Sequence, residues 1–127
     1  MMGRDVLFPD ALTPEIIANA KDLLTRVNLL LTKYGAHPRV RSGWRPPLIN
    51  QSTPNAAPNS RHMTGQAIDL DDPDGDLDTW LIAAEGYKVL AECGLWMEHP
   101  AATKSWCHLQ SVPQRSFATT GLRYFYP

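Results

Sequence analysis

The longest regular pattern in the chain is a run of apolar residues at three- and four-residue intervals from Ile16 to Tyr34. This spacing is typical of one face of an α-helix, and most of the charged residues in the run fall on the other side. Thr-Pro-Glu at positions 13–15 is a strong helix start, and Gly35 is a strong helix end. Because the apolar stripe must be buried, we expect this helix to be the scaffold of the fold.

The rest of the chain predicts one further helix and several short strands. A second helix is expected from a cap at Asp76 or Asp78 to Gly94, although Gly86 inside it weakens the prediction. Strands are expected at residues 39–45, 66–70, 95–99, 105–112 and 122–126. Residues 46–59, rich in Pro, Asn and Ser, are expected to be a loop that borders the functional site, and residues 113–121 a turn.

Two main helices and about five strands, without a repeated βαβ rhythm, predict an α+β fold with the helices packed on a small, largely antiparallel sheet. The length of 127 residues fits a single domain covering residues 1–127, and we expect a monomer.

Charge and cysteine content narrow the classes of function. The net charge is −1 and no run of five like charges occurs, which argues against nucleic-acid binding. No apolar run reaches 18 residues and the N-terminus lacks a signal peptide, so we expect no membrane insertion and a chain that is cytoplasmic when synthesised. Cys93 and Cys107 lack CxxC spacing and are expected to be reduced and partly buried.

A possible metal site lies between residues 60 and 69, together with a histidine far downstream. His62 and Asp69 are seven residues apart, and His108 follows in a predicted strand. Two imidazoles and one carboxylate form a three-ligand set that leaves the fourth position of a catalytic zinc open. In the strand 66–70, Asp69 shares its face with the small Ala67, which leaves room for a metal.

Two other kinds of metal site fit the sequence less well. The acidic stretch Asp71–Gly75 lacks the spaced oxygen ligands and distal glutamate of a calcium loop, so a solvated turn is predicted there. A structural zinc would need a fourth ligand, for which His99 and Cys107 are the nearby candidates.

The pattern Ser60-x-His62-x-x-Gly65-x-Ala67-x-Asp69, followed by Trp106-x-His108, resembles the zinc D-alanyl-D-alanine metallopeptidases. That family includes bacterial DD-carboxypeptidases, DD-dipeptidases and phage L-alanyl-D-glutamate endolysins, and the Hedgehog signalling domain shares its fold. The likeness covers roughly residues 40–113, including the segment Ser42-Gly43-Trp44-Arg45-Pro46.

The resemblance implies that His62, Asp69 and His108 bind Zn²⁺, with Ser60 and Trp106 as supporting or substrate-contacting residues. Arg45 matches a family arginine near the substrate, suited to hold a carboxylate or polarise the scissile carbonyl. The implied reaction is hydrolysis of a peptide bond in peptidoglycan stem peptides or cross-links, by a carboxypeptidase or an endopeptidase. The implied setting is phage or prophage lysis, with the protein acting on the cell wall after release or as part of a virion.

The chain departs from the family at the general base. Better-known members carry Glu or His three residues before the last ligand, where this chain has Ser105. Glu98 is the best substitute if strands 95–99 and 105–110 pair, and Asp71 is the second choice. The departure leaves a second hypothesis open, a non-catalytic zinc-binding module with a phage structural or cell-wall-recognition role.

Overall fold

A computed structural model describes residues 11–53 and 60–126 of the chain. Over these ranges the chain forms five α-helices, one 3₁₀ turn and five strands, in the order α2 (Pro14–Tyr34), β1 (Val40–Ser42), α3 (Pro47–Ser52), η2 (Arg61–Thr64), β2 (Ala67–Asp71), α4 (Asp76–Ile82), α5 (Ala84–Glu92), β3 (Trp96–Glu98), β4 (Trp106–Gln110), α6 (Phe117–Thr120) and β5 (Tyr124–Phe125). The expected α+β class is confirmed, whereas the likeness to the Hedgehog-type fold stays a prediction.

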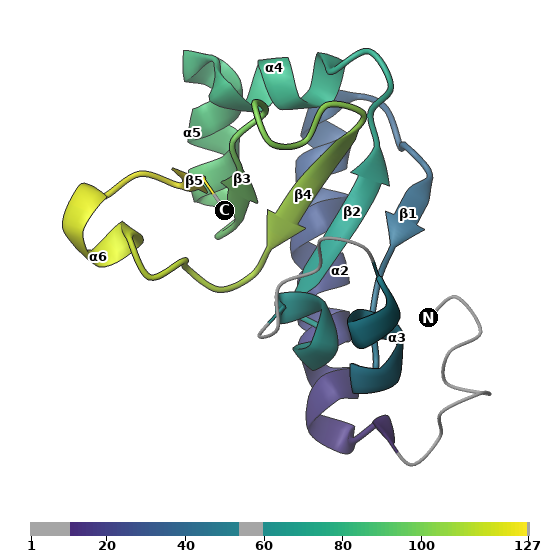
Figure 1. Cartoon of the computed structure of the whole chain (residues 1–127). Coiled ribbons are helices and arrows are strands. Elements are labelled where there is room, and N and C mark those ends of the chain that lie inside the picture. Colours follow the sequence, from purple (N-terminus) through teal and green to yellow (C-terminus); the bar gives the residue numbers. More distant parts are fainter. Residues whose placement is uncertain (1–10, 54–59, 127) are drawn as a thin grey trace.

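Helix α2 follows its sequence signals closely. The Thr13 side chain accepts a hydrogen bond from the backbone N–H of Ile16 at 3.2 Å, and proline occupies the start of the first turn. At the other end Gly35 adopts the left-handed conformation (φ 92°), and its backbone N–H donates a hydrogen bond to the Leu31 carbonyl oxygen. In Figure 1 the helix crosses behind the sheet.

The five strands form one sheet in the order β1-β2-β4-β3-β5. The pairs β1/β2, β2/β4 and β3/β4 are antiparallel, and β3/β5 is parallel. The prediction of a largely antiparallel sheet is therefore confirmed, and the parallel edge arises because the chain passes through α6 before it returns beside β3 (Figure 1). In the β2/β4 register Asp69 lies directly opposite His108.

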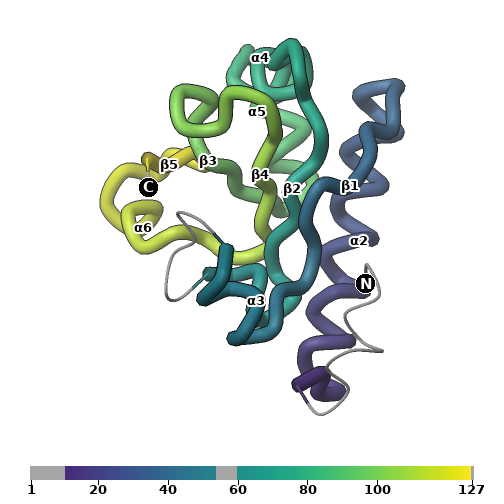
Figure 2. Tube along the Cα trace, turned by 45° about the vertical axis from the view of Figure 1, so that its right-hand side comes forward, coloured from purple at the N-terminus to yellow at the C-terminus, as the bar shows by residue number. Residues whose placement is uncertain are grey.

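The sheet has one apolar face and one polar face. Helices α2, α4 and α5 cover the apolar face, and α6 lies on the other side of the sheet from α2 (Figure 2). The core between the sheet and these helices contains Leu23, Val27, Leu30, Leu31, Ile68, Leu70, Leu77, Leu81, Leu90, Leu95, Met97, Cys107 and Leu109. Strand alternation then turns the intervening positions, Asp69 and His108 among them, to the polar face.

The prediction of one continuous second helix is wrong. Ala83 takes an extended conformation and divides the segment into α4 and α5. The break brings Gly86 so close to α4 that a Cβ there would lie 1.9 Å from the Trp80 carbonyl oxygen. Gly86 is therefore needed for close packing of the two helices rather than being a weak point of one.

The cap of α4 was also predicted wrongly. The N-cap position is Gly75, and the carboxylate of Asp72 accepts hydrogen bonds from the backbone N–H groups of Leu77 (3.0 Å) and Asp78 (2.9 Å). Asp72 is 5% exposed, so the turn at 71–75 is only partly the solvated turn that its composition predicts. Asp78, one of the two predicted caps, is instead 1% exposed.

Further differences concern short segments. Residues 47–52 of the predicted loop form α3, and residues 54–59 lie outside the described residues. The predicted turn at 113–121 contains the four-residue α6. Strands β1, β3, β4 and β5 are shorter than their expected ranges, whereas β2 has the expected five residues and lies one position later, at Ala67–Asp71.

Both cysteines are free, as expected, and both are buried rather than partly buried. None of the described helices has the length and apolar character that a membrane span requires.

Candidate metal centre

His62 is held in place by the 3₁₀ turn η2. The Ser60 hydroxyl accepts a hydrogen bond from the His62 backbone N–H at 3.2 Å, which caps the start of the turn. Gly65 ends the turn with φ 73°, and a Cβ there would lie 2.8 Å from the Ile16 carbonyl oxygen of α2. The close approach of α2 therefore requires glycine at this position of the motif, independently of the metal.

Asp69 and His108 come together through strand pairing. They lie directly opposite each other on β2 and β4, with their side chains on the polar face, and His108 Nδ1 is 2.9 Å from Asp69 Oδ1. The other carboxylate oxygen, Oδ2, is 3.3 Å from His62 Nε2. The three predicted ligands thus form one buried group whose candidate ligand atoms all lie within 4.8 Å of one another.

The hydrogen bonding of His62 fits a cation. Its Nδ1 lies 2.8 Å from the Gly43 carbonyl oxygen, which can only accept, so Nδ1 carries the proton and Nε2 carries a lone pair. This Nε2 is buried and has no hydrogen-bond partner, even though Asp69 Oδ2 lies near it. The reason is that the lone pair of Nε2 faces the lone pairs of a carboxylate, an arrangement that a shared cation would stabilise.

The pKa values of the three groups are mutually dependent. Burial holds the pKa of His62 below its ordinary value, although the nearby Asp69 opposes this. Burial alone would raise the pKa of Asp69, but the histidine contacts outweigh it and hold that pKa well below its usual range. Burial would likewise lower the pKa of His108, but the bond to Asp69 outweighs burial and raises it. Asp69 is therefore the anionic centre of the group.

Arg45 is attached to the same carboxylate. It is 8% exposed, and its guanidinium donates to Asp69 Oδ2 (3.3 Å), Ser42 Oγ (3.1 Å) and Asn50 Oδ1 (3.4 Å). Its backbone N–H donates to the His62 carbonyl at 2.9 Å. Arg45 thus links strand β1, helix α3 and the ligand carboxylate, which places a fixed positive charge beside the candidate metal site.

Glu98 lies on the strand pair that the sequence predicted. Strands β3 and β4 are antiparallel, with Met97 opposite Leu109, and Glu98 follows Met97 at the end of β3. By alternation its side chain is on the polar face, the face of His108. Burial raises the pKa of Glu98, and the charges of His108, Asp69 and Arg45 act on it, so it belongs to the electrostatic environment of the site.

The second-choice base, Asp71, has a charged partner. Arg41 Nε donates to Asp71 Oδ1 at 2.8 Å, and Arg41 also donates to Ser105 Oγ at 2.9 Å. The Arg41 guanidinium lies 5.7 Å from the centre of the half-buried Trp106 ring. Ser105, the residue in the family's base position, is therefore bound to Arg41, and Asp71 forms an ion pair with the same side chain.

Sequence reasoning missed four residues around the site: Gly43 and Gln110, which bond the histidine rings, Asn50, which bonds Arg45, and Phe125, whose ring lies 6.1 Å from that of His108. Gln110 could have been identified from the sequence, because strand alternation in β4 places it on the same face as His108. Gly43 and Phe125 are brought in by tertiary contacts that no sequence spacing predicts.

A fourth metal ligand is not found within residues 11–53 and 60–126. Cys107 lies opposite Leu70 in the apolar core, and the ring of His99 stacks on Tyr126. The group of potential ligands therefore comprises His62, Asp69 and His108 in the described part of the chain.

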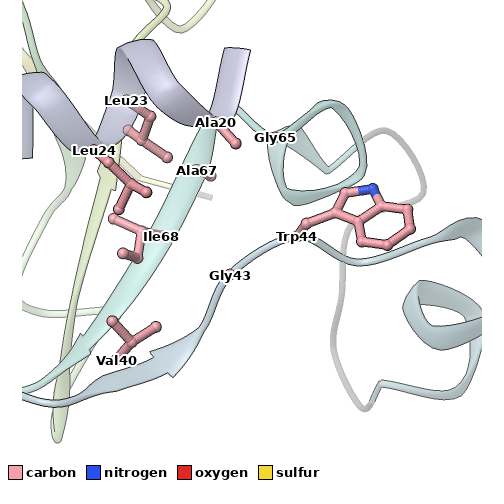
Figure 3. A pocket seen from close by; sticks show the side chains of 9 residues that line it. All are labelled: Ala20, Leu23, Leu24, Val40, Gly43, Trp44, Gly65, Ala67 and Ile68. Carbon is pink, nitrogen blue, oxygen red and sulfur yellow. The ribbon is translucent and has the colours of Figure 1, made fainter. Parts of the chain in front are cut away.

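An apolar cavity of about 290 Å³ lies between α2 and strands β1 and β2 (Figure 3). It is lined by Ala20, Leu23, Leu24, Val40, Gly43, Trp44, Gly65, Ala67 and Ile68. Since none of these side chains ionises or bears a nucleophile, this cavity is not the candidate active site.

Comparisons with known proteins found no matching family model, no matching curated protein and no matching solved structure.

Proposed function

We propose that the protein is a zinc-dependent peptidase that hydrolyses peptide bonds in peptidoglycan stem peptides or cross-links. The observation that carries the metal assignment is the buried group of His62, Asp69 and His108, in which His62 Nε2 has a lone pair but no hydrogen-bond partner. Two imidazoles and one carboxylate form one of the three-ligand sets found in catalytic zinc sites. The choice of peptidoglycan as substrate rests on the motif resemblance described above.

In this proposal zinc supplies a Lewis acid that polarises the scissile carbonyl and activates a water molecule. The chain supplies the rest of the chemistry. His62 and His108 are neutral donors when the metal is bound, and Asp69 supplies one negative charge. Arg45 holds Asp69 in place, and its remaining N–H groups are suited to a carboxylate or carbonyl of the peptide.

Glu98 is proposed to take the proton from water and return it to the leaving amine. Its raised pKa brings the carboxylate nearer to the operating pH, which makes it a better proton acceptor and donor than an exposed glutamate. Its partial burial beside Asp69 and His108 supports this role. Asp71 is less suitable because its Oδ1 already accepts a hydrogen bond from Arg41 Nε at 2.8 Å.

One observation favours the second candidate function, a non-catalytic zinc-binding module. Ser105, in the family's base position, is held by Arg41 and cannot act as a base at neutral pH. If Glu98 does not replace that base, the site binds metal without hydrolysing a peptide.

The test is metal content measured together with turnover of purified peptidoglycan and of a peptide ending in D-Ala-D-Ala. We expect one zinc per chain in the wild type, none in His108→Ala, and wild-type zinc without turnover in Glu98→Gln. Asp71→Asn is the matched control and should keep most of the activity. Zinc binding with no turnover of either substrate would support the binding module, and the absence of zinc from the wild type would exclude both proposals.

A further inference from the structure

We propose that Gln110 is a positioning residue that determines which ring nitrogen of His108 binds the metal. The inference rests on the zinc site proposed above but not on peptide hydrolysis. Gln110 lies on β4, two residues after His108, and is 4% exposed.

The orientation of the Gln110 amide follows from its two contacts. Its Nε2 lies 2.9 Å from the Val112 carbonyl oxygen, and its Oε1 lies 2.9 Å from His108 Nε2. Since the Val112 carbonyl can only accept, the amide NH₂ group must point toward it. The amide oxygen therefore faces His108, and it accepts a proton carried on His108 Nε2.

This hydrogen bond leaves Nδ1 as the metal-binding atom of His108. Nδ1 lies 2.9 Å from Asp69 Oδ1, inside the ligand group, whereas Nε2 points away toward Gln110. His62 shows the opposite arrangement, because the Gly43 carbonyl accepts from Nδ1 and Nε2 faces Asp69. The two histidines thus present different nitrogens, and in each case a neutral oxygen behind the ring determines which one.

Removing this acceptor should weaken metal binding. In Gln110→Met the side chain keeps its length but has no oxygen, so a proton on His108 Nε2 loses its partner. The proton is then favoured on Nδ1, where Asp69 Oδ1 accepts it and competes with the metal. Loss of such an outer partner of a metal-bound histidine typically weakens affinity by about 10- to 100-fold.

The experiment measures the zinc Kd by competition with a chromogenic chelator. We expect Gln110→Met to raise the Kd by about 10- to 100-fold, and Gln110→Glu, which keeps an acceptor toward His108, to retain most of the wild-type affinity. Gln114→Met is the matched control, because Gln114 also donates to a backbone carbonyl, that of Leu122 at 2.8 Å, but lies outside the site. A wild-type Kd in a folded Gln110→Met protein would overturn the inference.

A second readout needs no variant. Long-range ¹⁵N–¹H NMR of the zinc-loaded wild type should show the His108 proton on Nε2 and the His62 proton on Nδ1. A His108 proton on Nδ1 would overturn the inference. If the proposed peptidase function is wrong, the protein should bind zinc and show the expected effect of Gln110→Met on the Kd, but hydrolyse neither substrate. Hydrolysis with no Gln110 effect would refute the positioning role and leave the peptidase standing.

Discussion

Asp78 should make the stability of the fold depend on pH, and this can be measured with one substitution. Asp78 is 1% exposed and belongs to helix α4, which packs on the apolar face of the sheet, away from the candidate metal site. Thr103 Oγ1 donates to its Oδ2 at 2.8 Å, whereas its Oδ1 is buried without a hydrogen-bond partner. Burial raises the pKa of Asp78 from 3.8 to about 6, and the nearby Thr103 hydroxyl and Cys107 thiol only partly oppose the shift.

The sign of the effect follows from linkage. Because the folded state holds the proton more tightly than the unfolded chain, the stabilisation is fully present below the unfolded pKa of 3.8. It is lost as the pH rises through the folded pKa of about 6. At about 1.36 kcal/mol per unit of pKa difference, protonated Asp78 contributes about 3 kcal/mol to the free energy of unfolding at low pH. About 2 kcal/mol of this contribution is lost between pH 4.5 and 7.5.

The perturbation is Asp78→Asn, which keeps the size of the side chain and an oxygen for Thr103 but cannot ionise. Urea unfolding with a metal chelator present gives the free energy of unfolding of both proteins at each pH. As the pH rises from 4.5 to 7.5, we expect the free energy of unfolding of the variant to increase by about 2 kcal/mol relative to that of the wild type. Titrating groups that do not interact with Asp78 cancel in this difference. A difference that does not change with pH would refute the reasoning, since Asp78 would then ionise as it does in the unfolded chain.

Three further outcomes are expected. Gly86→Ala should lower the free energy of unfolding by about 3 kcal/mol, because the new Cβ would lie 1.9 Å from the Trp80 carbonyl oxygen. Gly35→Ala is the control: its Cβ would meet open space, so only its left-handed backbone should cost stability, about 1 kcal/mol. Asp72→Ala should cost about 2 kcal/mol by removing the cap of α4, against less than about 0.5 kcal/mol for the exposed Asp74→Ala, both measured by urea unfolding. Zinc at 100 times its Kd should stabilise the wild type by about 2.7 kcal/mol in thermal melts, and a variant lacking a ligand histidine should show no such gain.

Local signals in the sequence were enough for several features. The limits of α2 followed from its cap residues and its apolar spacing, because both are read within one or two turns of helix. The α+β class and the antiparallel character of most of the sheet also followed from the order and length of the apolar runs. The grouping of His62, Asp69 and His108 was predicted because their spacing matched a known motif.

Tertiary packing decided the features that depend on residues far apart in the sequence. The break at Ala83 and the need for Gly86 arise from contact between two helices, which propensity within either segment does not report. The burial of Asp72 and Asp78 could not be read from an acidic, turn-rich stretch, whose composition predicts exposure.

The same division runs through the candidate site. The sequence by itself determined which side chains carry the donor atoms, since ligand chemistry is a property of residue type and spacing. Only the tertiary structure decided which nitrogen of each histidine faces Asp69, because Gly43 and Gln110 bond the rings from behind. It also decided that Arg41 binds Asp71 and Ser105 while Arg45 binds Asp69. Hydrogen bonds between strands and loops are set by the packed arrangement of the whole chain, and no local pattern specifies them.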